Sequence, residues 1–196
     1  MRFKNVRVFA IAVLILGFTG TNLFGQTVPA LDDPGNRDAQ RLDALAEQIR
    51  HELVTISNYS VFDWLEGEVK PDGTVTLRGQ VSEPIVKSDA EAKLKRLESV
   101  KAVTNEIEVL PLSPADDDLR RATYRAIYNF DSPLSRYAMQ AVPSMHILVK
   151  NGHIALKGIV DSEADSQLAY NAARQVNGAF SVKNELKVVG EESKRR

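Results

Sequence analysis

The feature that most constrains this chain is a short hairpin pattern that occurs twice. Residues 145–160 read MHILVKNGHIALKGIV, with apolar and other residues alternating on both sides of Asn151-Gly152. Asn-Gly between two alternating runs predicts a two-residue β-hairpin turn, because both turn positions need positive φ. Residues 68–81, EVKPDGTVTLRGQV, repeat the plan around Asp72-Gly73. The fold must therefore accommodate the same unit twice.

The repetition extends well beyond the two hairpins. Residues 75–81 match residues 154–160 at an offset of 79, and residues 103–107 match residues 182–186 at the same offset. A constant offset across the intervening segments means that their helices and loops match in length. Two copies of one small domain explain this pattern. Gly79 and Gly158 occupy matched places, where we expect close backbone packing or a β-bulge.

Each copy has the element order helix, strand, strand, helix, strand. Apolar residues at helical spacing predict the first helix, over about residues 41–56, and a second helix is expected from Ser82 to about Glu98, capped by Ser82. The second copy opens with a helix at Asp116-Asp117-Asp118, where acidic residues complement the helix dipole. The predicted organisation is a leader over residues 1–30, a linker over 31–40, a domain over 41–110, a linker over 111–115, a domain over 116–190 and a charged tail over 191–196.

The first 30 residues predict export. A basic start is followed by an apolar run of 11 residues, VFAIAVLILGF, which has signal-peptide length and is short for a membrane span. Val28-Pro29-Ala30 and Leu23-Phe24-Gly25 are alternative cleavage sites. The chain has no cysteine, so we expect neither disulfides nor a lipoprotein anchor. The expected location is periplasmic or secreted, with an inner-membrane anchor through an uncleaved N-terminal helix as the alternative.

At these motifs the sequence resembles the BON domain family. The residues that carry the resemblance are Asp72-Gly73 with Val75–Val81 and Val100–Val109, then Asn151-Gly152 with Ile154–Val160 and Gly178–Val188. The first copy departs from the family pattern with Ser99 in place of glycine, and the second has Ala179 where valine is usual. The resemblance implies an α+β fold of two tandem αββαβ sandwich domains. Each would have a three-stranded mixed sheet with two helices on one face.

The resemblance also implies a function. Similar proteins are exported to the cell envelope, are often linked to stress, and several bind anionic phospholipid or support envelope integrity. The family supplies no catalytic residues. We therefore expect a non-enzymatic protein whose partner is an anionic phospholipid surface or an envelope protein. The alternative is a soluble periplasmic chaperone-like module that contacts other proteins.

Few residues suggest chemistry. His146 and His153 flank the second hairpin turn, and we expect a surface cross-strand pair rather than a metal site, because a third ligand is missing. Asp116-Asp117-Asp118 lacks the glycine and later glutamate of a calcium loop. Asn105 and Asn184 are matched positions, each expected to make a turn or strand-edge hydrogen bond. We expect no metal and no cofactor.

The charge distribution favours the second copy as the binding unit. Residues 41–110 hold nine basic and thirteen acidic residues, whereas residues 115–190 hold nine and eight. This balance argues against a general nucleic-acid binder. On the first helix of the second copy, four residues share the face opposite the apolar stripe: Arg121, Tyr124, Arg125 and Tyr128. Arginine interleaved with tyrosine suits a membrane interface, so these four residues are the predicted membrane-binding site. The alternative is a solvated helix face, on which Asp117 and Asp118 offset the charge of the arginines.

Overall fold

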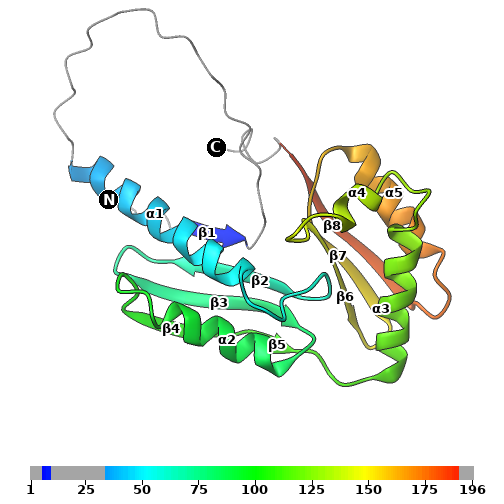
Figure 1. Ribbon diagram of the computed structural model, residues 1–196, viewed down its shortest axis with the longest axis horizontal. Helices are drawn as coiled ribbons and strands as arrows, with labels where there is room; N and C mark the ends of the chain where they lie inside the picture. The colour runs from blue at the N-terminus through cyan, green and yellow to red at the C-terminus, as the bar shows by residue number, and fades with distance from the viewer. Residues whose placement is uncertain (1–5, 10–33, 190–196) are drawn as a thin grey trace, which may run out of the picture.

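The computed structural model describes residues 6–9 and 34–189 of the chain. These residues form two α+β domains that lie side by side (Figure 1). The rest of the predicted leader, residues 31–33 and the predicted tail over 191–196 lie outside the described residues. No helix of the described part is both long and apolar enough to cross a membrane.

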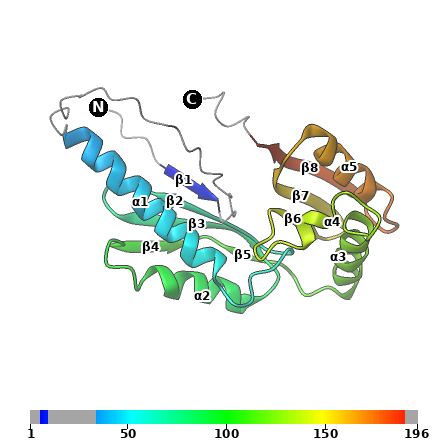
Figure 2. The same cartoon turned by 45° about the horizontal axis from the view of Figure 1, so that its top comes forward.

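The first domain contains two helices and a mixed sheet. Its elements are α1 (Pro34–Val54), β2 (Trp64–Val69), β3 (Thr74–Val81), α2 (Pro84–Leu94), β4 (Ala102–Asn105) and β5 (Glu108–Val109). Strands β2 and β3 are antiparallel, while β4 and β5 both run parallel to β3. A further strand, β1 (Val6–Phe9), lies antiparallel beside β2 and close to α1 (Figure 2).

The second domain repeats this plan with one added helix. Its elements are α3 (Pro114–Ile127), α4 (Ser135–Ala138), β6 (Met145–Lys150), β7 (His153–Val160), α5 (Glu163–Arg174) and β8 (Ser181–Val188). The strand order is β6-β7-β8, with β6 and β7 antiparallel and β7 and β8 parallel. The predicted tandem αββαβ architecture is confirmed, and the first sheet gains the unexpected strand β1.

Alternation along the strands builds one core in each domain. In the first domain Leu65, Val69, Val75 and Leu77 pack under α1 and α2. The second core lies under α3 and α5 and is built from the corresponding positions of β6 and β7. Neighbouring residues along a strand point to the other side of the sheet, which we call the open face. Each domain therefore presents a helical layer on one side and an open sheet face on the other.

The two hairpin turns are not identical. Asn151 has φ 52° and Gly152 has φ 77°, so the second hairpin has the predicted turn with two positive φ values. In the first hairpin Gly73 has a positive φ of 84° and Asp72 does not. Lys70 N–H donates to Thr74 O at 2.9 Å, which leaves a three-residue loop that includes Pro71. The prediction that Asp72-Gly73 forms the same two-residue turn as Asn151-Gly152 is therefore wrong in detail, because the first loop has one more residue.

Gly79 and Gly158 allow two strands to approach closely. Their φ values are 131° and 128°. A Cβ on Gly79 would lie 1.9 Å from Trp64 O, and one on Gly158 would lie 2.1 Å from Ser144 O. The predicted close backbone packing is confirmed at both positions.

The matched asparagines tie the third strand to the second helix. Asn105 Nδ2 donates to Lys87 O and Glu91 Oε2, and Asn184 Nδ2 donates to Ser166 Oγ at 2.9 Å. Each asparagine Oδ1 also accepts the N–H two residues further on, from Ile107 and Leu186. These are the local hydrogen bonds expected of both residues.

Several predicted boundaries move. Helix α1 begins at Pro34, so residues 34–40 of the predicted linker are helical, and α3 begins at Pro114, inside the second predicted linker. Ser113 caps α3 by accepting a hydrogen bond from Asp116 N, so the predicted helix start was two residues late. The predicted cap of α2 is also wrong, because the N-cap is Glu83 and no side chain caps the helix.

Candidate functional site

The two domains meet through a seam of buried aromatic residues. Trp64 begins β2 on the open face of the first sheet, and it packs against Leu148 on the open face of the second. His146 lies against Trp64, with ring centroids 5.3 Å apart, and against Tyr59, with centroids 5.5 Å apart. Lys157 Nζ lies 5.9 Å from the centroid of the Trp64 ring. These contacts fix the two sheets against each other.

The loop before β2 supplies part of this seam. Val61 O accepts a hydrogen bond from Ile147 N at 2.8 Å, so the loop covers the edge of β6. Phe62 meets the Tyr124 ring of α3 edge to face, with centroids 6.2 Å apart. Val61 and Phe62 both pack on the core of the second domain. A segment that belongs to the first domain by sequence thus completes the core of the second.

A buried carboxylate shapes that loop. Asp63 is fully buried, and its Oδ2 accepts hydrogen bonds from Ser60 N at 2.9 Å and Ser60 Oγ at 2.7 Å. Its Oδ1 accepts from Ser82 N at 2.6 Å and Ser82 Oγ at 2.8 Å. Ser82 is therefore unavailable as the helix cap, because its hydroxyl holds the seam loop onto the end of β3.

His146 is a buried neutral histidine. It has no exposed surface, and burial lowers its pKa to about 4. Its Nε2 lies 3.4 Å from the Tyr59 hydroxyl, and burial also raises the pKa of Tyr59. The predicted surface pair of His146 with His153 is wrong, because the strand register pairs His146 with Lys157 and His153 with Lys150. His153 is exposed, and its Nδ1 lies 2.7 Å from Ser181 Oγ.

Charges on the open faces differ between the domains. Glu66, Glu68 and Glu108 lie on the first open face around Arg78, while Lys150, Lys157 and Lys183 lie on the second around Glu185. The two faces are joined where Lys150 Nζ approaches Glu108 Oε1 at 2.5 Å. Hydrogen bonds from Gln80 and Lys150 lower the pKa of Glu108.

The predicted membrane-binding face of α3 is divided by the structure. Arg121 and Arg125 are exposed, and Arg121 pairs with Asp118 at 2.6 Å. Tyr128 is 9% exposed, and its hydroxyl donates to Met145 O at 3.0 Å. Tyr124 is half-buried against Phe62 and Tyr128. The expectation that all four side chains face outward is wrong for the tyrosines, because the seam loop and β6 cover them.

The three aspartates at the start of α3 have separate roles. Asp116 is buried and accepts hydrogen bonds from Asn151 N at 2.8 Å and Gly152 N at 2.7 Å. It therefore joins the helix N-terminus to the hairpin turn. Asp117 pairs with Arg120, whose Nη2 donates to Val149 O at 2.8 Å. The prediction that this cluster is a helix start is confirmed.

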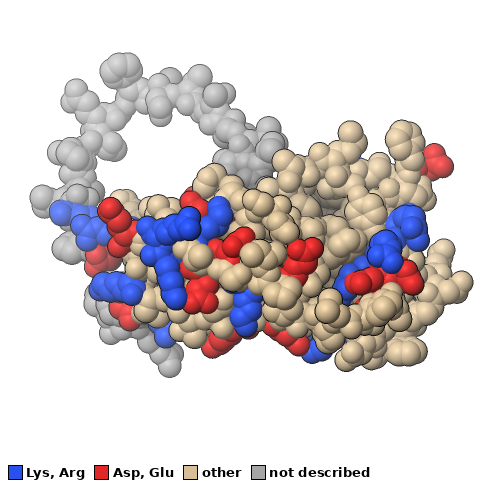
Figure 3. All heavy atoms as spheres, turned by 60° about the horizontal axis from the view of Figure 1, so that its bottom comes forward, with Lys and Arg blue, Asp and Glu red and all other residues tan. Residues whose placement is uncertain are grey.

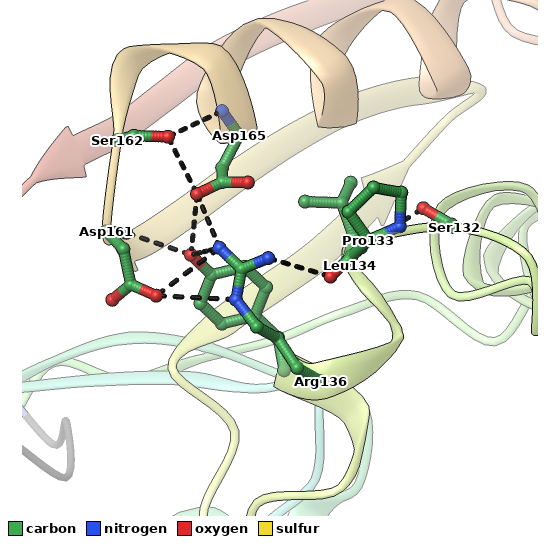
Figure 4. A network of polar contacts seen from close by, with 8 residues as sticks. Ser132, Pro133, Leu134, Arg136, Asp161, Ser162 and Asp165 are labelled. Carbon is green, nitrogen blue, oxygen red and sulfur yellow. Dashed lines mark hydrogen bonds and ion pairs between the residues drawn. The ribbon is translucent and has the colours of Figure 1, made fainter.

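The segment between α3 and β6 is held by a polar network (Figure 4). Arg136 Nη2 donates to Asp165 Oδ2 at 2.6 Å, and that oxygen also accepts from Tyr137 OH at 3.1 Å and Ser162 Oγ at 2.8 Å. Burial acts to raise the pKa of Asp165, but these hydrogen bonds and the charge of Arg136 outweigh it and lower that pKa. Burial raises the pKa of Tyr137 to about 12. The network ties α4 to the start of α5.

Two large apolar side chains in this segment face solvent. Phe130 is 98% exposed and Met139 is 86% exposed. In the view of Figure 3, basic and acidic side chains are intermixed over the first domain, whereas the second domain shows a cluster of both kinds on an otherwise largely uncharged surface. Among the described residues, no three metal-ligating side chains lie close enough together to hold an ion.

Sequence reasoning missed the seam. Tyr59, Val61, Phe62 and Trp64 are four large side chains in and just after a predicted helix end. Such a density of apolar residues in a loop is a signal that the loop is covered. The sequence alone does not reveal what covers the loop, because Phe62 meets Tyr124 and Trp64 meets His146, both of the second copy.

These features define a class of protein: a tandem repeat of two small α+β domains that pack against each other through a buried seam, each with one helical and one open sheet face. The family model of the BON domain matches residues 62–111 and 134–190. The chain therefore belongs to the BON domain family, as its sequence predicts.

Known relatives extend the comparison. Osmotically-inducible protein Y of Escherichia coli (strain K12) is 30% identical over 152 residues, which cover 74% of this chain and 71% of the relative. Two solved structures of CdsD, a structural protein of the type III secretion system of Chlamydia trachomatis, align at 14% identity. They cover 78% and 73% of this chain and 96% of each CdsD chain, with TM-scores of 0.28 and 0.27. These TM-scores are too low to support a structural inference.

Proposed function

We propose that this protein is an exported, non-enzymatic envelope protein that serves envelope integrity under osmotic stress, and that its second domain binds anionic phospholipid surfaces. Its similarity to an osmotically inducible protein supports the link to osmotic stress. The leader-like sequence of residues 1–30 supports export.

The observation that carries membrane binding is the outer face of α3 together with the residue beyond its end. Arg121 and Arg125 are exposed and lie one helical turn apart. Phe130 follows the helix and is 98% exposed. Guanidinium groups pair with lipid phosphates, and an aromatic ring is favourable at the headgroup level. In this proposal Phe130 supplies the aromatic ring that was expected of Tyr124 and Tyr128.

The expected affinity is modest. Each basic residue near an anionic surface contributes about 1 kcal/mol, and burial of one phenylalanine side chain contributes about 1.5–3 kcal/mol. Binding should therefore need anionic lipid and weaken with salt.

Flotation of the purified protein with vesicles tests the proposal. We expect the protein to float with phosphatidylglycerol-containing vesicles and to stay unbound with phosphatidylcholine alone. The double variant Arg121→Glu, Arg125→Glu should bind at least tenfold more weakly. The matched control Arg41→Glu, Arg96→Glu makes the same charge change on exposed residues of the first domain, and it should bind within about twofold of the wild type.

Two results would overturn the proposal: no dependence on anionic lipid, or an equal loss in both double variants. Suppressed aggregation of an unfolded client, without flotation, would instead favour the chaperone-like alternative.

A further inference from the structure

The two domains have equivalent strand edges, and in both a segment from outside the domain covers that edge. Pairing of Leu65 with Gly79, and of Met145 with Gly158, makes β2 the counterpart of β6 and Gly67 the counterpart of Ile147. At β6, Ile147 N donates to Val61 O of the first-domain loop. At β2, Gly67 pairs with Val8 of β1. Val8 therefore covers the edge of β2 as Val61 covers the edge of β6.

The backbone of β2 is arranged to receive a strand. Lys70 N–H donates to Thr74 O within the hairpin. Because hydrogen bonds alternate along an antiparallel strand, Glu68 and Glu66 also bond toward β3. Gly67 and Val69 then direct their N–H and C=O groups to the outer edge. Without β1 this edge would be unpaired, and an unpaired edge is a template for strand addition.

The register defines the chemistry of a fitting strand. Val6 pairs with Val69 and Val8 with Gly67, both positions of the helix-covered side, while Arg7 pairs with Glu68 on the open face. Phe9 pairs with Glu66, the other open-face position of this register. A strand with apolar residues at alternate positions and a basic residue opposite Glu68 matches this edge. The covering segment lies within the predicted leader, so cleavage after Ala30 would remove it.

We propose that the outer edge of β2 is a strand-accepting site. Residues 6–9 fill it in the full chain, and once the leader is removed it takes an extended apolar-basic segment of another polypeptide. This site is on the first domain and is independent of the membrane-binding face of α3.

A peptide titration tests the site without altering the protein. The probe is a fluorescently labelled peptide of residues 4–11, KNVRVFAI. The receptor is residues 31–196, which retain every residue of the two hydrophobic cores, since those residues all lie between Leu42 and Val188. We expect saturable binding by fluorescence anisotropy. The full chain, with β1 already on β2, should bind the peptide at least tenfold more weakly.

Backbone methylation of the peptide gives a matched control. The alternation that directs Gly67 toward β1 also directs the N–H of Val8 toward β2 and the N–H of Phe9 away from it. An N-methyl group on Val8 should therefore weaken binding at least tenfold, whereas one on Phe9 should change it by less than about threefold. The absence of saturable binding to residues 31–196, or an equal loss for both methylated peptides, would refute the site.

Discussion

Trp64 of the first domain meets His146 of the second edge to face, with ring planes 72° apart, at a point where neither side chain is appreciably exposed. The contact joins β2 of the first sheet to β6 of the second. Each ring is thus part of the packing of both domains, and we expect the domains to unfold as one cooperative unit.

Removal of the indole tests this coupling. Trp64→Ala should lower the free energy of unfolding by about 3–5 kcal/mol, the usual cost of truncating a buried aromatic residue. It should also split the denaturant transition, followed by circular dichroism, into two. Phe130→Ala is the control, because that side chain is 98% exposed and its loss should cost less than about 0.5 kcal/mol. A single transition at unchanged stability would show that the seam does not couple the domains.

Acid should weaken the seam through His146. Burial lowers the folded-state pKa of His146 from 6.5 to about 4. Between these values the unfolded chain binds a proton that the folded chain excludes, so stability is full above the higher value and falls as the pH drops. The slope from this residue is at most about 1.4 kcal/mol per pH unit. Fluorescence of Trp64, the sole tryptophan, reports unfolding directly at the seam.

Two substitutions separate this effect from the carboxylates. Asp165 and Glu108 have lowered pKa values, so the stability that they contribute to the folded protein also falls in acid. That contribution is the same in every variant. His146→Gln should flatten the slope between about pH 6.5 and 4. His153→Gln should retain it, since His153 is exposed. An unchanged slope in His146→Gln would assign the acid sensitivity elsewhere.

The carboxylate of Asp116 should stabilise the second hairpin. Asp116→Ala removes the acceptor of two backbone N–H groups and should cost about 1–3 kcal/mol in urea denaturation. Faster amide exchange at Asn151 and Gly152 should accompany the loss. Asp118→Ala, at an exposed position of the same helical turn, should cost less than about 0.5 kcal/mol. Equal losses in the two variants would indicate a helix-dipole effect instead.

Gly158 should tolerate no side chain. Its φ is 128°, and Ser144 O lies 2.1 Å from the position that a Cβ would occupy. Gly158→Ala should therefore cost at least about 3 kcal/mol or prevent folding. Gly178 has φ 94° but nothing within 4 Å of its Cβ position, so Gly178→Ala should cost about 1 kcal/mol. Thermal denaturation compares the two variants. Similar melting temperatures would show that the close approach of Ser144 O does not cause the loss of stability in Gly158→Ala.

Local patterns were enough to predict the two folds. Alternation around Asn151-Gly152 specified a hairpin because turn geometry and side-chain facing are settled within a few residues. The match between residues 75–81 and residues 154–160, which includes Gly79 and Gly158, then predicted the same hairpin in both domains. The constraint at each glycine comes from the adjacent strand of its own hairpin, so it was visible in the sequence.

The candidate site was predicted less well, because distant residues decide which surfaces remain exposed. Helical spacing placed Tyr128 opposite the apolar stripe of α3, but Met145 O accepts its hydroxyl. Tyr124 is covered by Phe62, a residue of the other domain. His146 was predicted to lie in a surface pair with His153, but it has no exposed surface. No local pattern in the sequence indicates that Trp64 of the first domain covers this histidine.

The seam loop makes the two repeats unequal. Val61 and Phe62 lie in the first copy, yet they finish the packing of the second. A second domain expressed alone would keep its hairpin, but its core would lack these two side chains and Ile147 N would lose its bond to Val61 O at the edge of β6. The two halves of this duplication have thus ceased to be interchangeable.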